Sequence, residues 1–240
     1  MDLRNKICVA LDVDNCQKAK NIVTLLKNEV GLFKVGFQLF TDPGSSSFLD
    51  ELVGMGVKVF LDLKINDIPN TALNAAKNLV KRGVYMFNVH ASGGSNMLRS
   101  TAEAAAEEAD KLGLIRPVVL AVTVLTSIDS QILKTELNVG VSIEEQVISL
   151  ARLAKQSGLD GVVASPRETK LVKSACGENF IVLTPGIRPA WSVKADDQKR
   201  VTTPREAIQN GSDFIVIGRP IIGAPDPQAA VSKIISEISK

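Results

Sequence analysis

Short apolar runs alternate along this chain with longer segments in which apolar residues recur every three or four positions. The short runs are rich in Val, Ile, Leu and Phe, a composition typical of buried strands, whereas the longer segments have the spacing of amphipathic helices. The predicted strands are Ile7–Leu11, Leu32–Val35, Val57–Leu63, Tyr85–Val89, Pro117–Val122, Gly161–Ala164, Ile181–Leu183 and Phe214–Ile217. The predicted helices are Cys16–Glu29, Ser46–Met55, Pro69–Arg82, Ser95–Leu112, Ile143–Ser157, Arg167–Ala175, Pro204–Asn210 and Pro227–Ile238.

Strands that alternate with helices form βαβ units and a parallel sheet. Repeated eight times in a chain of 240 residues, this unit predicts an α/β protein made of one (β/α)8 TIM barrel domain over residues 1–240. A doubly wound open sheet is the alternative, but no Gly-x-Gly-x-x-Gly motif follows the first strand, which argues against its dinucleotide-binding version. A left-handed C-cap is expected where a glycine follows a predicted helix. Those glycines are Gly31, Gly56, Gly83, Gly113, Gly158 and Gly211.

Composition narrows the possible partners and the compartment. Hydrophobic residues make up 45% and charged residues 22% of the chain, so a large core is expected. The net charge of +2 gives no sign of nucleic-acid binding, and no apolar run approaches the ~20 residues of a membrane span. The first residues lack the apolar stretch of a signal peptide, and three cysteines without metal-type spacing suggest reduced thiols in the cytoplasm. A single histidine, His90, excludes a histidine-rich metal site.

The third predicted strand ends in a cluster of charges. Asp62 and Lys64 are two residues apart, so on a regular strand their side chains share one face, and Asp67 follows in the next loop. Opposite charges at the carboxyl end of a barrel strand are typical of a substrate site, because barrel chemistry takes place at that end. A surface ion pair is the alternative for this segment taken alone.

Other strand ends add to this cluster. Asp12 follows the first strand, where a helix-capping role is the alternative. Lys34 lies in the second strand, and its neighbours Phe33, Val35 and Phe37 indicate a buried strand rather than a surface lysine. His90 ends the fourth strand, and both a direct substrate role and a supporting role are open for it.

The last two strands indicate a phosphate site. Loops after the seventh and eighth strands commonly bind phosphate in these barrels. The first of these loops begins with Thr184–Pro189 and continues as the polar segment Ala190–Thr203, whose length is typical of a lid. Gly218 allows a backbone N–H to approach an oxyanion, and Arg219 adds a bidentate guanidinium. A solvated basic loop is the alternative.

Taken together, these motifs resemble the orotidine 5′-phosphate decarboxylase family over nearly the whole chain. The metal-dependent sugar-phosphate decarboxylases and synthases share the Asp-x-Lys-x-x-Asp core, but they carry a metal-binding glutamate in the second strand, where this chain has Lys34. The segment at Trp191, Val193 and Lys194 is bulkier than the glycine-rich lid of the family. The matching segments are Ala10–Asp12, Phe33–Gly36, Asp62–Thr71, Asn88–Ala91, Val122–Ser127, Thr184–Pro189, Asp197–Arg200 and Ile217–Arg219.

The resemblance implies a cytoplasmic homodimeric enzyme that decarboxylates orotidine 5′-phosphate to uridine 5′-phosphate, the last step of de novo pyrimidine nucleotide synthesis, without cofactor or metal. Lys64 would protonate C6, while Lys34, Asp62 and Asp67 would complete an alternating charge network. Asp67 and Thr71 would reach the neighbouring subunit's site. Substrate-binding roles are implied for Asp12, Lys34, Asp62, Thr71, Thr126, Arg188, Gln198, Gly218 and Arg219.

Two rival functions are compatible with such a barrel. A metal-dependent sugar-phosphate decarboxylase or aldolase would be sensitive to EDTA. A catalytically inactive phosphate-binding barrel would be expected to lack Asp62 or Lys64, and both residues are present.

Overall fold

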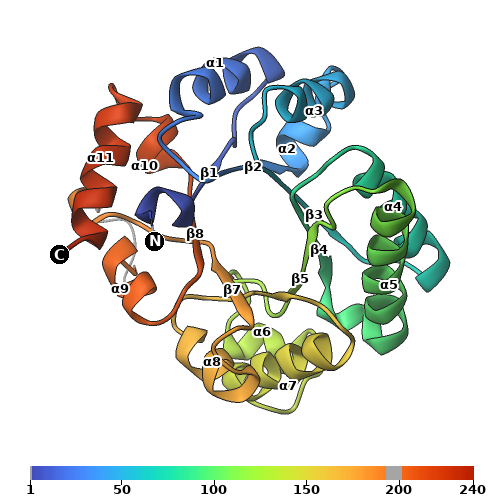
Figure 1. Ribbon diagram of the computed structural model, residues 1–240. Coiled ribbons are helices and arrows are strands. Elements are labelled where there is room, and N and C mark those ends of the chain that lie inside the picture. Colours follow the sequence, from blue (N-terminus) through green and yellow to red (C-terminus); the bar gives the residue numbers. More distant parts are fainter. Residues whose placement is uncertain (1, 193–201) are drawn as a thin grey trace.

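The chain forms a closed barrel of eight parallel strands in the order β1 to β8, as a computed structural model that describes residues 2–192 and 202–240 shows (Figure 1). This confirms the predicted (β/α)8 barrel and excludes the open doubly wound sheet. The strands are β1 Ile7–Ala10, β2 Leu32–Gly36, β3 Val59–Ile65, β4 Met86–His90, β5 Val118–Val122, β6 Gly161–Val163, β7 Ile181–Thr184 and β8 Phe214–Ile217.

The helices surround the strands as an outer ring (Figure 1). Three short helices were not predicted: α2, α6 and α10, each following a strand on the side where the site lies. The helices are α1 Cys16–Leu26, α2 Phe37–Phe40, α3 Ser45–Gly54, α4 Pro69–Lys81, α5 Gly94–Leu112, α6 Ser130–Thr135, α7 Ile143–Gln156, α8 Thr169–Cys176, α9 Pro204–Gln209, α10 Arg219–Ile222 and α11 Pro227–Ile238. Three 3-10 turns are also present: η1 Leu3–Lys6, η2 Ala91–Gly93 and η3 Ala190–Ser192.

The alternating direction of strand side chains divides the core into two layers. On β1, Ile7 and Val9 belong to the layer between the strands and the helices. Cys8 and Ala10 point the other way and join Phe60 in the smaller cluster that fills the barrel interior. The interior layer is therefore the floor on which polar side chains at the strand ends rest.

Three local predictions are corrected by the structure. β3 begins and ends two residues later than predicted, so Lys64 lies within it. Phe37 does not continue a buried strand but opens α2, and its side chain is 56% exposed. Gly31 is absent from the glycines with positive φ, which include the other five predicted caps. Gly31 serves close packing instead, because a Cβ there would come within 2.5 Å of the Asn5 carbonyl oxygen.

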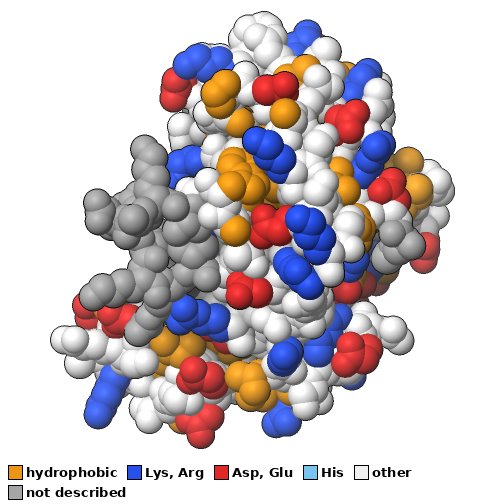
Figure 2. All heavy atoms as spheres, turned by 90° about the vertical axis from the view of Figure 1, so that its left-hand side faces the viewer, with side chains coloured by type: hydrophobic (Ala, Val, Ile, Leu, Met, Phe, Trp, Pro, Cys, Tyr) orange, Lys and Arg blue, Asp and Glu red, His pale blue; other side chains and the backbone are white. Residues whose placement is uncertain are grey.

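Acidic and basic side chains are intermixed on the face seen from the α11 side of the barrel, and neither sign dominates it (Figure 2). This pattern agrees with the small net charge of the chain. Among the described helices, none combines the length and the apolar character needed to cross a membrane.

Candidate active site

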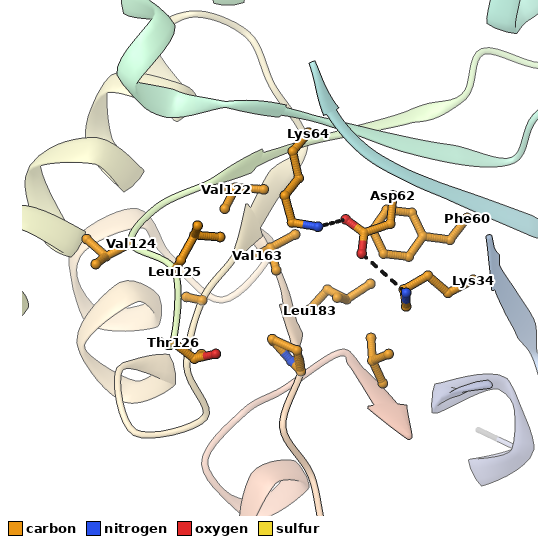
Figure 3. Close-up of a pocket in the computed structure, with 13 residues that line it drawn as sticks. Lys34, Phe60, Asp62, Lys64, Val122, Val124, Leu125, Thr126, Val163 and Leu183 are labelled. Atoms are coloured by element: carbon orange, nitrogen blue, oxygen red, sulfur yellow. Dashed lines mark hydrogen bonds and ion pairs between the residues drawn. The ribbon is translucent and has the colours of Figure 1, made fainter. Parts of the chain in front are cut away.

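Four charged side chains form a continuous row at the carboxyl ends of the first three strands. Lys64 Nζ lies 2.7 Å from Asp62 Oδ1, and Lys34 Nζ lies 3.5 Å from Asp62 Oδ2. Lys34 Nζ also lies 3.1 Å from Asp12 Oδ1. Figure 3 shows Asp62 between the two ammonium groups, with its carboxylate shared by both. The charges alternate along the row, as the sequence predicted for Lys34, Asp62 and Lys64.

β2 places Lys34 inside the barrel mouth rather than on the surface. The Lys34 side chain is only 12% exposed, whereas Asp12 is 49% exposed. Gly36 makes room for the ammonium group, because a Cβ at that position would lie 2.8 Å from Lys34 Nζ. Asp12 contacts this ammonium and does not cap α1, since Asn15 accepts the hydrogen bond from the Lys18 N–H. Asp12 and Lys34 therefore act as a pair.

β3 does not follow a regular strand path through the row. Its register against β4 shifts after Leu61, and Lys64 has a φ of 52°. The prediction that Asp62 and Lys64 lie together is confirmed, but the regular two-residue alternation that suggested it is interrupted here. The ammonium reaches Asp62 from a distorted segment of strand.

The surroundings keep these groups charged. Burial raises the pKa of Asp62, but Lys34, Lys64 and the Asn88 side chain outweigh burial, and the pKa of the carboxyl falls below its ordinary value. Burial lowers the pKa of Lys34, but Asp62 and Asp12 outweigh it, and the pKa of the ammonium rises. Both effects favour an ionised Asp62 carboxylate beside an ionised Lys34 ammonium at neutral pH.

A cavity of about 170 Å³ adjoins the row. One wall carries Lys34, Asp62 and Lys64, and the facing wall is almost entirely apolar (Figure 3). Thr126, for which the resemblance implies a place near the substrate ring, is the polar exception among the residues of that second wall. A flat ring could lie on the apolar wall with one edge directed at the charges. The apolar lining was not identified from the sequence and comprises Phe60, Val122, Val124, Leu125, Val163, Ala164, Leu183, Pro185 and Val216.

A second hollow continues from Thr126 and Pro185 to Arg188. The pKa of the Arg188 guanidinium is lowered, first by burial and then by the nearby Arg219 charge. Two guanidinium groups close to each other suit an anion with two negative charges. Gly218 brings the end of β8 against β1, because a Cβ there would lie 3.3 Å from the Cβ of Ala10. Gln198 and most of the predicted lid lie outside the described residues.

The other predicted residues are placed apart from the row. Asp67 is exposed, and its carboxylate accepts a hydrogen bond from the Ile68 N–H at 2.7 Å. Thr71 is exposed in the first turn of α4. Within one chain, neither joins the charged row. His90 does not line the cavity, and burial followed by the Lys64 charge lowers its pKa, which favours a supporting role for a neutral imidazole.

Sequence reasoning gave no role to Asn88, which the structure places beside the row. Its side chain is fully buried and hydrogen-bonds both Asp62 and the backbone of Lys64. The available signal was an amide within the otherwise apolar strand Tyr85–Val89. In residues 2–192 and 202–240, no three His, Cys, Asp or Glu side chains group closely enough to hold a metal ion.

Comparison with known proteins identifies relatives over the whole chain. A profile of the Orotidine 5′-phosphate decarboxylase / HUMPS family matches residues 5–234. The chain is 48% identical to an orotidine 5′-phosphate decarboxylase of Moorella thermoacetica over 99% of this chain and 94% of the relative. It is 47% identical to the enzyme of that name from Syntrophomonas wolfei, with both chains fully covered. The crystal structure of orotidine 5′-phosphate decarboxylase from Lactobacillus acidophilus superposes with a TM-score of 0.86 at 42% identity, covering 98% of this chain and 99% of the other.

Proposed function

The chain belongs to the Orotidine 5′-phosphate decarboxylase / HUMPS family, and from this membership we propose that it decarboxylates orotidine 5′-phosphate to uridine 5′-phosphate in pyrimidine nucleotide synthesis. It is thus a carbon–carbon lyase. The observation that carries the proposal is the Lys34–Asp62–Lys64 row on one wall of an otherwise apolar cavity.

The reaction is difficult because of where the electrons go. Breaking the bond between C6 and the carboxylate releases CO2 and leaves an electron pair on C6, in the plane of the pyrimidine ring. The ring π system cannot delocalise that pair. The protein must therefore stabilise the developing charge electrostatically, with groups fixed before the reaction begins.

Asp62 would act on the ground state. Its lowered pKa keeps it ionised, so a substrate carboxylate placed beside it is repelled. Two like charges ~4 Å apart repel by roughly 4 kcal/mol at an effective dielectric constant near 20. Full relief of that repulsion on CO2 loss would accelerate the reaction about a thousandfold. This is too little for a very slow uncatalysed reaction, so a second group is required.

Lys64 would act on the product side of the bond. Its ammonium would face the negative charge that develops at C6 and then transfer one proton to that carbon. The neutral amine would regain its proton from solvent. The 2.7 Å contact between Lys64 and Asp62 supports this assignment, because the proposed donor lies beside the carboxylate proposed to repel the substrate carboxylate.

The other residues would bind the parts of the substrate that do not react. We assign the ribose hydroxyls to Asp12 and Lys34, the pyrimidine to Thr126, and the phosphate to Arg188, Gln198, Gly218 and Arg219. Binding energy from a remote phosphate can drive desolvation and orientation at the ring. Orotidine, which lacks the phosphate, should therefore be a poor substrate.

We further propose a homodimer in which Asp67 and Thr71 complete the partner's site. These residues belong to an exposed segment, Asn66–Thr71, in which Ile68 is 66% exposed. We place the enzyme in the cytoplasm. We propose no metal, because the Lys34 ammonium lies between the carboxylates of Asp12 and Asp62 and already balances their negative charge, where a cation would otherwise bind.

One assay tests the proposal. The purified protein is expected to consume orotidine 5′-phosphate, followed by the ultraviolet absorbance of the orotate ring, at the same rate with and without EDTA. Loss of activity in EDTA that returns with a divalent cation would indicate the metal-dependent alternative. Complete inactivity toward orotidine 5′-phosphate in a folded protein would indicate the inactive phosphate-binding barrel.

A further inference from the structure

Asn88 is opposite the irregular part of β3. Leu61 pairs with Phe87 and Ile65 pairs with Val89, so three residues of β3, Asp62 to Lys64, face the single residue Asn88 of β4. A regular ladder cannot satisfy the backbone groups of three residues with those of one. Some other group must stabilise this bulge.

The Asn88 side chain supplies the missing acceptor. Its Oδ1 accepts a hydrogen bond from the Lys64 N–H at 2.7 Å. Lys64 has a φ of 52°, a conformation that costs a residue with a side chain on the order of 1–3 kcal/mol. The hydrogen bond to the Asn88 side chain therefore holds the backbone of Lys64, the proposed proton donor, in a conformation that is otherwise unfavourable.

The other end of the same amide fixes Asp62. Asn88 Nδ2 donates to Asp62 Oδ1 at 2.7 Å, the same oxygen that accepts the Lys64 ammonium. The orientation of the amide is unambiguous, because the backbone N–H requires an acceptor and the carboxylate requires a donor. Asn88 is 0% exposed, so solvent does not compete for either bond.

We propose that Asn88 is a positioning residue that fixes the carboxylate of Asp62 and the backbone of Lys64 relative to each other. It acts through these two groups and does not line the cavity. The catalytic part of this inference rests on the proposed decarboxylase function, since the two groups that Asn88 holds are assigned there to ground-state repulsion and proton transfer. A preorganised pair loses rate steeply when its geometry relaxes.

Two substitutions separate the two bonds. Asn88→Asp preserves shape and the acceptor for the Lys64 N–H but places a second carboxyl against Asp62. Asn88→Ala removes both bonds. Each variant is expected to lower kcat by roughly tenfold to a hundredfold, the effect of losing a hydrogen bond to a charged group. The affinity for uridine 5′-phosphate should change by less than about threefold, because the phosphate-binding residues are untouched.

Thr101→Val is the matched control. Thr101 is also fully buried, and its hydroxyl donates to the Met97 carbonyl oxygen at 2.7 Å within α5, away from the row. This variant loses a buried hydrogen bond of similar kind and should keep the wild-type kcat. If folded Asn88 variants keep kcat within twofold of wild type, or lose kcat and nucleotide affinity together, the positioning role is refuted.

Hydrogen exchange of the wild-type protein tests the contact without a variant. The Lys64 amide is expected to exchange slowly, like the amides of the neighbouring strands, because its acceptor is buried. Exchange as fast as that of an exposed loop amide would overturn the inference even if no Asn88 variant folds. A wild-type protein without decarboxylase activity but with a protected Lys64 amide would refute the proposed function and leave the structural role of Asn88 supported.

Discussion

Lys64 combines an unusual backbone conformation with a partly exposed charge at the point where the proposed reaction would take place. Its side chain is 27% exposed, so it is the more accessible partner of the ion pair with Asp62, which is 14% exposed. An ammonium that is partly accessible and paired on one side can still approach a substrate atom from the cavity. This placement makes Lys64 the residue whose removal should affect turnover most.

Lys64→Ala is expected to abolish turnover while leaving the binding of uridine 5′-phosphate largely intact. The ammonium is the proposed proton donor, whereas the phosphate would be bound near Arg188 and Arg219. The rate is measured by ultraviolet absorbance and the affinity by calorimetry. Lys18→Ala, which removes a solvent-exposed ion pair with Asp14 at the start of α1, is the control and should behave as wild type. A Lys64→Ala rate above about a tenth of wild type, a loss below ~1.4 kcal/mol, would contradict the assignment.

Arg219→Ala is expected to impair orotidine 5′-phosphate far more than orotidine. Loss of a bidentate charge-assisted contact should lower kcat/KM for the phosphorylated substrate by roughly 1.5–3 kcal/mol. Orotidine never uses this contact, so its low kcat/KM should hardly change. Arg152→Ala, on the exposed surface of α7, is the control for loss of one guanidinium. Equal losses for both substrates would shift the phosphate assignment to Arg188.

Among single residues, the sequence predicted the charged residues of the candidate site better than the neutral ones. Asp12, Lys34, Asp62 and Lys64 were predicted because charges at the ends of apolar strands have few structural explanations. Asn88 was not, because an amide in a strand has many possible partners, and its partner is an irregularity of β3 that no spacing rule reveals. The apolar wall was missed for a similar reason, since Val122, Val163 and Val216 look like any other core residues in the sequence.

Among the elements, η3 deserves a separate experiment because it lies directly after the predicted phosphate ligand Arg188. Trp191, the only tryptophan of the chain, is in this turn, and Lys233 of α11 lies over its ring at 5.6 Å from the centroid. The backbone N–H of Arg188 donates to the Thr202 carbonyl oxygen, so the residues just before η3 are hydrogen-bonded to the residues just before α9. A phosphate that engages Arg188 should therefore alter the surroundings of the Trp191 indole.

Titration with uridine 5′-phosphate is expected to change the intrinsic fluorescence of Trp191, and titration with uridine is not. Arg188→Ala should abolish the response, whereas Lys233→Ala should change the starting spectrum by removing the cation and leave a response in place. Steady-state emission on excitation of the indole measures both. The same change from saturating uridine would place the source of the signal at the ring site rather than the phosphate site.

The structure confirms predicted element boundaries where turn residues flank a clear apolar pattern. β8 and α11 were predicted at their observed ends, since clear apolar periodicity and turn residues flank both. α2, α6 and α10 were missed because helices of four to six residues contain too few positions for a periodicity to appear. The shift of β3 had the largest consequence, since it brings Lys64, one residue beyond the predicted end at Leu63, into the strand.

For the whole molecule, the barrel could be predicted because the same strand–helix unit recurs along the chain. Each βα unit is ambiguous alone, but the repeated alternation of strand and helix allows few other topologies. The structure of one chain can be compared only with the part of the proposed site that one chain forms. The structure of one chain leaves Asp67 and Thr71 exposed beside α4 and gives them no contact with the charged row.

If the site is shared between subunits, two inactive proteins should restore each other. Lys64→Ala and Asp67→Asn carry their defects in different halves of the proposed shared site. In a mixed dimer, one site would then receive both defects and the other neither. Equal amounts with free exchange should recover about a quarter of wild-type activity, because half of the dimers would be mixed and one of their two sites intact.

The matched control is a mixture of Lys64→Ala with Asp62→Asn. Both residues belong to the same chain's row, so every site of a mixed dimer would carry one defect, and no activity should return. Native mass spectrometry of the mixtures confirms that subunits have exchanged. Recovery in both mixtures, or in neither after confirmed exchange, would contradict the proposal that Asp67 serves the partner's site. Recovery in the first mixture alone would explain why a residue so close in sequence to Asp62 and Lys64 lies outside their row within a single chain.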